Sequence, residues 1–194
     1  MFEIFAQYRQ PIGQHRPVCI KLRGPGMILL GLGGNLPSAA HGPPQATLSA
    51  ALTQLEQAGL SILRRSPWYR SAPVPAGDQP WFINAVAVAA AALPPRAVLD
   101  LLHQVERGFG RLRRERNAAR PIDLDLLAYD DIVEGDAAAG SGLVLPHPRL
   151  QERAFVLLPL RDVAPLWRHP ATGASLDAMI EALPPGQQVE RMAP

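Results

Sequence analysis

The stretch RNAARPIDLDLLAYDD, residues 116–131, places two aspartates one residue apart inside a run of aliphatic side chains, just downstream of several arginines. Alternate side chains of a β-strand point to the same face of its sheet. A strand over residues 121–130 therefore turns Asp123 and Asp125 together to one face, with about 7 Å between them. The aliphatic side chains that alternate with them point to the core, namely Ile122, Leu124 and Leu126. The stretch thus predicts a core strand that also presents a pair of carboxylates.

Strand-like and helix-like patterns alternate along the chain from Met27 onward. Short apolar or β-branched runs predict strands over residues 28–32, 61–70, 81–90 and 121–130. Leucines at helical spacing predict a helix over residues 46–58, and Pro94 and Pro95 open a second helix. The apolar face of this second helix is formed by Val98, Leu101, Leu102 and Val105.

The predicted order β-α-β-β-α-β is typical of the ferredoxin-like arrangement, in which two helices cover one face of an antiparallel four-stranded sheet. We therefore predict an α+β protein with this fold. The C-terminal third is predicted to add a short hairpin near residues 143–147, a helical stretch near residues 152–160 and a last helix from about Ser175 to Leu183.

The composition is that of a globular chain long enough to bury a core, with 194 residues of which 47% are hydrophobic and 19% charged. There is no uninterrupted apolar run long enough for a membrane span, and the first residues do not have the pattern of a secretory signal. Cys19 is the only cysteine, which excludes an internal disulfide and a cysteine-based zinc site. We expect a cytoplasmic protein with no membrane partner.

The first 26 residues differ from the rest in charge and in pattern. They show no sustained periodicity and carry a net charge of +3, from Glu3 against Arg9, Arg16, Lys21 and Arg23. We interpret residues 1–26 as a disordered N-terminal extension, or as an upstream assignment of the start with Met27 as the natural beginning; the alternative is an arm that docks on the domain. Residues 27–194 are expected to form a single domain that is close to neutral, so no nucleic-acid partner is expected.

The paired aspartates allow two interpretations. At 7 Å, two carboxylates repel each other by about 2 kcal/mol at an effective dielectric near 20, so positive charge is expected beside them. The simpler interpretation is a solvated strand face with arginine partners. The functional interpretation is a Mg²⁺ site, because this ion is usually held by one or two carboxylates together with substrate phosphates and water.

A cluster of arginines upstream of the aspartates favours the functional interpretation. Residues 110–120, GRLRRERNAAR, include Arg111, Arg113, Arg114, Arg116 and Arg120. So many cations with only Glu115 among them repel one another unless an anion binds, and guanidinium groups match phosphate oxygens in pairs. A Walker-type phosphate loop is excluded because Lys21 is the only lysine. Carboxylates for metal beside arginines for phosphate indicate phosphoryl-type transfer.

Seven motifs then occur in order: GLGGN (31–35), WYRSAPV (68–74), DQPWFINAV (78–86), ERGFGRLR (106–113), RPIDLDLLAY (120–129), LPHPRLQERAFVLLPL (145–160) and DVAP (162–165). Together they closely resemble the 6-hydroxymethyl-7,8-dihydropterin pyrophosphokinase family of folate biosynthesis, over Met27 to about Pro170. The family has a ferredoxin-like fold, in agreement with the predicted order of elements.

The resemblance implies transfer of the β,γ-diphosphate of ATP, the co-substrate, to the hydroxymethyl oxygen of the reduced pterin, which leaves AMP. It implies that Asp123 and Asp125 hold two Mg²⁺ ions and that Arg111 and Arg120 are catalytic arginines that bind ATP. Further ATP-binding residues implied by it are His103, Glu106, Arg113, Leu126, His147 and Arg153. Without the resemblance, Glu106 could be an ordinary i,i+4 partner near Arg107 and His147 a helix-start histidine bonded to backbone.

The pterin-binding residues implied by the resemblance are Ser71, Ala72, Val74, Phe82, Asn84 and Phe155. Phe82 and Phe155 match its aromatic stacking positions, and the alternative for each is an ordinary core residue. Asn84 is costly to bury unpaired within FINAVAV, and the amino-pyrimidinone edge of a pterin offers matching donors and acceptors. Asn35 is expected to fix loop geometry rather than to touch substrate.

Several residues depart from the family pattern, and other functions remain open at this point. Gly34 stands where the family usually has serine, and Ala118 and Ala119 replace a frequent Gly-Pro. Alternatives are RNA binding by exposed sheet aromatics, a nucleotidyltransferase that releases pyrophosphate, and a silent relative. The general base could be Asp125 or a metal-bound water, and a monomer is expected.

Overall fold

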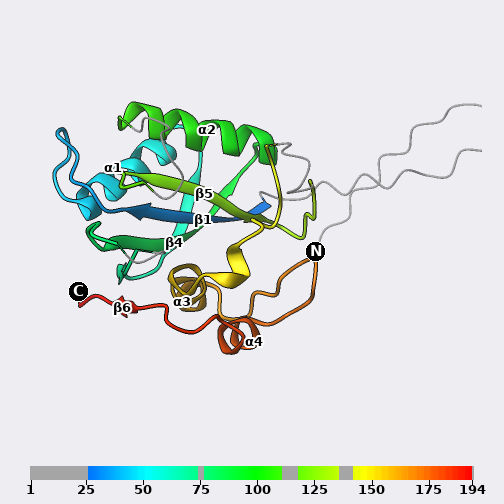
Figure 1. Ribbon diagram of the computed structural model, residues 1–194. Helices are drawn as coiled ribbons and strands as arrows, with labels where there is room; N and C mark the ends of the chain where they lie inside the picture. The colour runs from blue at the N-terminus through cyan, green and yellow to red at the C-terminus, as the bar shows by residue number, and fades with distance from the viewer. Residues whose placement is uncertain (1–25, 74–76, 111–117, 136–141, 194) are drawn as a thin grey trace, which may run out of the picture.

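A six-stranded antiparallel sheet forms the centre of the computed structural model, which describes residues 26–73, 77–110, 118–135 and 142–193 (Figure 1). The strands are β1 (Gly26–Gly34), β2 (Ser61–Arg65), β3 (Tyr69–Ser71), β4 (Phe82–Ala91), β5 (Asp123–Tyr129) and β6 (Val189–Arg191). Their order is β5-β1-β4-β3-β6, and β2 pairs with β4 beside β3. The first five strands therefore reproduce the ferredoxin-like order, with β2 and β3 together in the place of one strand.

Helices cover both faces of the sheet. The helices are α1 (Pro44–Gln57), α2 (Pro95–Gly108), α3 (Ala154–Val163) and α4 (Leu176–Glu181), with a 3-10 turn η1 (Leu150–Glu152) before α3. Figure 1 shows α1 and α2 on one side of the strands and α3 and α4 on the other. Among the described residues, no helix has the length and apolarity that crossing a membrane requires.

Alternation along the strands divides the core into two layers, one on each face of the sheet. Ile122, Leu124 and Leu126 pack with α1 and α2, whereas Leu127, Leu29 and Val86 pack against α3 and α4. Burying each such aliphatic side chain stabilises the fold by about 1.5–3 kcal/mol. Asp123 and Asp125 therefore point to the face that α3 covers only in part.

The helix starts follow the chemistry of their first residues. Pro94 and Pro95 precede and open α2, where a missing N–H is tolerated because the first turn has no intrahelical acceptor for it. Ser175 caps α4, since its side chain accepts a hydrogen bond from the Ala178 N–H at 3.3 Å. Gly59 ends the turn after α1 with a φ of +98°, which a side chain would disfavour.

Three elements differ from the sequence prediction. The strand over residues 61–70 is divided, because Ser66 turns both its N–H and its Oγ to the backbone of Val86 and Pro67 has no N–H to continue the ladder. The hairpin near residues 143–147 is present in the described chain as one antiparallel bridge, Glu134 to Leu145. Strand β6 was not predicted; it extends the sheet beyond β3.

Candidate active site

The two aspartates lie on β5 at the end of the sheet that α3 leaves uncovered, and each has an arginine beside it. The Arg120 guanidinium lies 3.4 Å from the Asp123 carboxylate, and the Arg153 guanidinium lies 3.8 Å from the Asp125 carboxylate. The two carboxylates are partly exposed, at 22% for Asp123 and 35% for Asp125. Arginine partners are therefore present, as the simpler interpretation required, but both carboxylates still face solvent.

The residues of β1 opposite the two aspartates are glycines, which leave the sheet surface beside the carboxylates free of side chains. In the pairing of β1 with β5, Gly33 lies opposite Asp123 and Gly31 opposite Asp125. A Cβ atom at Gly33 would lie 3.4 Å from the Asn84 Oδ1 and 3.8 Å from the Asp123 Cβ. A side chain at Gly33 would therefore occupy the space between the aspartate pair and Asn84.

The donor set fits a divalent cation that arrives with phosphates. Within the described ranges, no group of three or more His, Cys, Asp or Glu side chains could hold a metal ion alone. Mg²⁺ does not require such a cage, because it keeps several waters and takes phosphate oxygens. Asp123 and Asp125 supply the one or two carboxylates that this mode of binding uses.

Asn35 holds the backbone around Arg120. Its Oδ1 accepts the Arg120 N–H at 2.8 Å, its own N–H donates to the Arg120 carbonyl at 2.9 Å, and its Nδ2 donates to the Pro80 carbonyl at 3.0 Å. Asn35 is buried. The prediction that it fixes loop geometry is confirmed.

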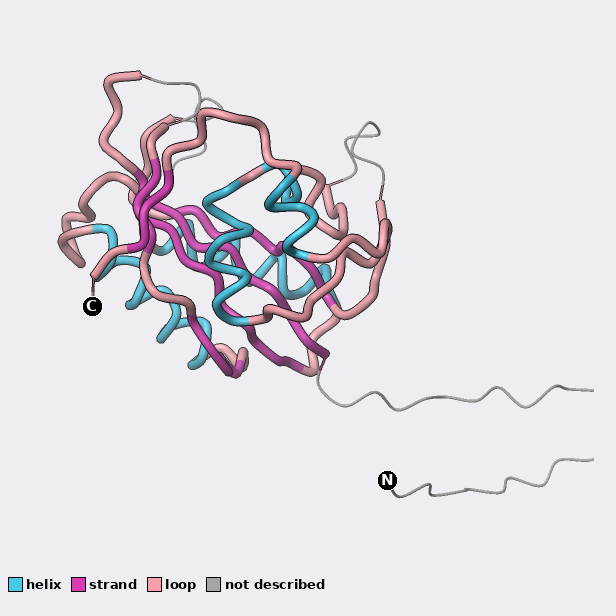
Figure 2. Tube along the Cα trace, turned by 90° about the horizontal axis from the view of Figure 1, so that it is seen from below, coloured by secondary structure: helices cyan, strands magenta, loops and turns pink. Residues whose placement is uncertain are grey.

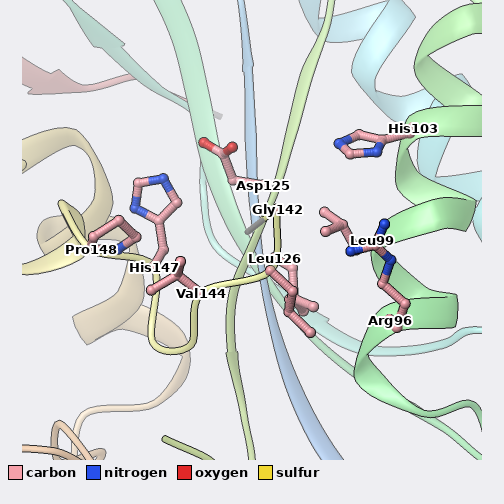
Figure 3. Close-up of a pocket in the computed structure, with 10 residues that line it drawn as sticks. Arg96, Leu99, His103, Asp125, Leu126, Gly142, Val144, His147 and Pro148 are labelled. Atoms are coloured by element: carbon pink, nitrogen blue, oxygen red, sulfur yellow. The ribbon is translucent and has the colours of Figure 1, made fainter. Parts of the chain in front are cut away.

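A cavity of about 470 Å³ opens between α2 and the segment that precedes η1. Figure 3 shows the Asp125 carboxylate and the imidazole of His147 on one side of it and His103 of α2 on the other. The lining residues are Arg96, Leu99, His103, Asp125, Leu126, Gly142, Leu143, Val144, His147 and Pro148. The cavity thus combines an apolar wall with basic groups and one carboxylate.

His147 is held as a neutral imidazole at the rim of this cavity. Its backbone N–H donates to the Leu127 carbonyl on the outer edge of β5 at 2.8 Å, and its Nδ1 accepts the Arg149 N–H at 3.2 Å. Burial, and then the charges of Arg153 and Arg149, lower the pKa of His147 to about 4. With Nδ1 as an acceptor, the proton of the neutral ring is on Nε2, which can donate to an anion.

Glu106 contacts the strand that carries the aspartates. Its carboxylate is buried, and its Oε1 accepts the backbone N–H of Leu124 at 2.7 Å. Leu124 is on the free edge of β5, where the ladder with β1 leaves this N–H without a strand partner. Glu106 therefore fixes the strand position that lies between Asp123 and Asp125.

A second group of predicted residues gathers on the same sheet face, on β3 and β4. The Asn84 Nδ2 donates to the Ser71 Oγ at 2.9 Å, and both residues are buried. Phe82 is two residues before Asn84 on β4 and is partly buried. The Ala72 N–H donates to the Gln188 carbonyl at 3.0 Å.

The start of α3 places Phe155 beside Arg153, which is the partner of Asp125. The Arg153 guanidinium carbon lies 5.3 Å from the centre of the Phe155 ring, and the same guanidinium is the partner of Asp125. Burial lowers the pKa of Arg153, with Arg149 as the next cause.

The predicted site residues therefore form two groups that meet at Asp123 and Asp125. Arg111, Arg113 and Val74 lie outside the described residues. The sequence analysis missed Arg96 and Leu99, although both share the α2 face of His103 at helical spacing, which could have identified them. It also missed the contribution of Leu143 and Val144, which reach the cavity only through the tertiary fold.

Comparison with known proteins gives consistent matches. Residues 29–165 match the family model of 7,8-dihydro-6-hydroxymethylpterin-pyrophosphokinase (HPPK). The chain is 38% identical to a 2-amino-4-hydroxy-6-hydroxymethyldihydropteridine pyrophosphokinase of Synechocystis sp. over 79% of this chain and 74% of that protein. It is 39% identical to the protein of the same name from Methylorubrum extorquens, over 70% of this chain and 81% of that protein.

Longer proteins also contain a matching part. The chain is 35% identical to the mitochondrial folate synthesis bifunctional protein of Arabidopsis thaliana, over 70% of this chain and 23% of that protein. Among solved structures, Plasmodium falciparum HPPK-DHPS A437G superposes with a TM-score of 0.63 at 13% identity, over 87% of this chain and 47% of that one. At this identity the structural match supports the fold alone, and the chain spans less than half of that protein.

Proposed function

Since the chain belongs to the 7,8-dihydro-6-hydroxymethylpterin-pyrophosphokinase family, it is a pyrophosphokinase of folate biosynthesis, and we propose that its two substrates meet at Asp123 and Asp125. ATP occupies the side of the cavity, with its triphosphate near His147. The pterin occupies the side of the sheet face, beside Asn84. The observation that supports this division is that the two neighbouring aspartates border different regions. Asp125 lines the cavity, whereas Asp123 lies beside Gly33 and Asn84 on the sheet face.

Mg²⁺ is proposed to be bound by Asp123 and Asp125, with two ions as the expected number. When bound with ATP, such ions neutralise phosphate charge and polarise the phosphoryl group that is attacked. Arg120 and Arg153 now pair with these carboxylates. In the complex their guanidinium groups would turn to phosphate oxygens, and Asp123 and Asp125 would be left to hold the cation.

The transfer itself requires position and charge more than covalent chemistry. The hydroxymethyl oxygen of the pterin attacks the β-phosphorus, the bond between this phosphorus and the α,β-bridging oxygen breaks, and AMP leaves. The hydroxyl proton passes to an acceptor at the place where the two substrates meet, either a carboxylate oxygen of Asp125 or solvent. We propose that His147 Nε2–H and the cations Arg120 and Arg153 stabilise the charge that moves with the diphosphate.

The residues proposed for the pterin supply a polar edge and flat walls. Asn84 and Ser71 present amide and hydroxyl groups to the amino-pyrimidinone edge. Phe82 and Phe155 supply rings for stacking, which adds about 0.5–1.5 kcal/mol beyond burial. Ala72, in the loop after β3, and Val74 are proposed to contact the pterin through backbone groups.

We further propose that the protein acts as a monomer in the cytoplasm. Both groups of proposed substrate contacts belong to one chain, so the site does not require a second copy. Sedimentation of the purified protein would test this, and a stable dimer would contradict it.

The nucleotide product is the test that separates this function from its rivals. The chain is incubated with ATP, Mg²⁺ and 6-hydroxymethyl-7,8-dihydropterin, and the nucleotides are resolved. AMP is expected; ADP or free pyrophosphate would show a different transfer.

Asp125→Ala is expected to lower turnover by several orders of magnitude with an unchanged melting temperature, and a mild effect would place the metal elsewhere.

A further inference from the structure

The segment that follows α4 packs against β3 and the start of α3, two elements that carry residues of the proposed substrate site. This segment lies beyond residues 29–165, which match the family. Its strand β6 pairs with β3, and the Met192 N–H donates to the Trp68 carbonyl at 2.9 Å. Figure 2 shows the C-terminus beside the strands. This C-terminal segment, residues 184–193, therefore connects the β3 edge of the sheet with the start of α3.

Gln187 makes the contact at the start of α3. Its Oε1 accepts the Ala154 N–H at 2.9 Å, and its Nε2 donates to the Glu152 carbonyl at 2.9 Å and to the Pro184 carbonyl at 3.5 Å. Glu152 and Ala154 are the two neighbours of Arg153. One amide side chain thus binds the backbone on both sides of this arginine.

Arg153 lies at a bend between two helical elements. Its φ and ψ of −117° and 109° are extended, while η1 ends at the residue before it and α3 begins at the residue after it. The amide of Gln187 spans this bend and satisfies an N–H of the first turn of α3, which has no acceptor within the helix. The direction in which the Arg153 side chain leaves the backbone depends on the angle of this bend.

We propose that Gln187 is a positioning residue for the transfer, because it sets the bend that brings Arg153 to Asp125 and Phe155 to the pterin. The distance from Arg153 to Asp125, 3.8 Å, and the distance from Arg153 to the Phe155 ring, 5.3 Å, both depend on this bend. This inference rests on the proposed function for its effect on catalysis. It gives residues outside the matched part of the chain a role in the site.

Three variants test the role of the amide. Gln187→Leu removes all of its hydrogen bonds at similar volume, and Gln187→Glu keeps an acceptor for the Ala154 N–H. Gln188→Leu is the matched control, since the side chain of Gln188 is exposed and its described contact is through the backbone carbonyl. For Gln187→Leu, kcat/KM for the pterin is expected to fall about tenfold, with KM for ATP changed less than twofold. Gln187→Glu keeps only one of the two contacts across the bend and is expected to fall between the wild type and Gln187→Leu, and Gln188→Leu is expected to be unchanged.

A local readout keeps this test independent of activity. Hydrogen exchange of the backbone amides of residues 152–156 is expected to be faster in Gln187→Leu than in the wild type and unchanged in Gln188→Leu. A lower melting temperature with unchanged kinetic constants would assign Gln187 a structural role only and overturn the proposal. Equal loss in both Gln187 variants, or unchanged exchange, would also overturn it. A wild-type protein that makes no AMP would instead refute the proposed function and leave the exchange result standing.

Discussion

Gly34 is the residue at which backbone contact leaves no room for a side chain. A Cβ atom there would lie 2.5 Å from the Pro121 carbonyl oxygen, which is too close for any real contact. The backbone of Pro121 therefore packs directly against the backbone at residue 34. Pro121 lies between Arg120 and Asp123 in the chain, so a shift of its backbone would also move these two residues.

Gly34→Ala is therefore expected to destabilise the fold by about 1–3 kcal/mol and to lower turnover, because the backbone at Pro121 must move away. The free energy of unfolding in urea and kcat measure the two effects. Gly108→Ala is the matched control, since a Cβ there would meet nothing within 4 Å at the end of α2. An alanine at residue 34 that leaves both quantities at their wild-type values would show that the loop yields without cost.

His147 makes stability depend on pH in a defined direction. Its pKa in the folded state is lowered to about 4 from 6.5, mainly by burial. The unfolded chain thus binds the proton more readily, and folding stability falls as pH decreases from about 6.5 toward 4. The contribution of His147 to the difference in unfolding free energy between pH 7 and pH 5 is expected to be up to about 2 kcal/mol.

Unfolding curves of His147→Gln at pH 7 and pH 5 measure this contribution. The variant is expected to lose less stability than the wild type over this interval. His169, whose pKa is also lowered by burial, is present in both proteins, so its effect cancels in the comparison. Equal losses in the two proteins would show that His147 is protonated as readily in the folded chain as in the unfolded one.

Alternation on a strand was sufficient to predict that Ile122, Leu124 and Leu126 enter the core while Asp123 and Asp125 face the other side of the sheet. The sequence predicted that arginines would lie beside the aspartates, but it did not predict that Arg153 would be the partner of Asp125. These two residues are 28 positions apart along the chain, and a local pattern does not report such a contact. The contact of Glu106 with the Leu124 N–H was missed for the same reason. Helical spacing could show only that Glu106 and His103 share one side of α2.

Among the elements, α2 and β5 pack through their apolar side chains, and the buried carboxylate of Glu106 adds a hydrogen bond between them. The Glu106 Oε1 accepts the Leu124 N–H at 2.7 Å, and the residue is 2% exposed. Glu106→Ala leaves this N–H without its acceptor at the edge of the sheet, and we expect a loss of about 1–3 kcal/mol in stability. Turnover is expected to fall as well, because Leu124 lies between the two aspartates.

Glu106→Gln and Gln104→Ala separate the causes of this effect. The glutamine keeps a carbonyl oxygen for the Leu124 N–H and is expected to retain most of the stability. Gln104 is on the exposed side of α2, and its change to alanine is expected to alter neither quantity. Thermal unfolding and kcat for the three variants measure the difference. Full activity in Glu106→Ala would show that β5 keeps its position without this contact.

The regular elements were predictable because their patterns are local. Residues 121–130 and the helix opened by Pro94 and Pro95 were found at nearly their observed positions. The break between β2 and β3 was not, because Ser66 ends the strand by bonding to Val86, which is 20 residues away. Strand β6 has only three residues, Val189–Arg191, and its alternation is too short to detect.

At the scale of the whole molecule, the described residues place helices on both faces of the sheet and leave Asp123 and Asp125 partly exposed at one end. The helix α3 packs on Leu29, Val86 and Leu127 of this face, while Asp123 and Asp125 remain partly exposed. Chain order alone predicted the sheet and its first two helices. The position of α3, which defines the uncovered end, depends on side-chain packing across the second face.

The basic N-terminal part of the chain is predicted to be dispensable for this architecture. The first strand begins at Gly26, which pairs with Ala91, and the Met27 N–H donates to the Asp130 Oδ1 at 2.7 Å. The start of the sheet is therefore fixed by contacts within residues 26–193. Deleting residues 1–25 removes one glutamate, three arginines and one lysine, a net charge of +3. We expect kcat, both KM values and the melting temperature to remain close to those of the full chain, because these charges are not needed to hold β1. A large loss of activity or stability would show that these residues form part of the domain, as a docked arm would.

RNA retention that depends on salt in the full chain and disappears on deletion would assign the positive charge to nucleic-acid binding, whereas retention by the shortened chain would revive the RNA-binding alternative for the sheet itself.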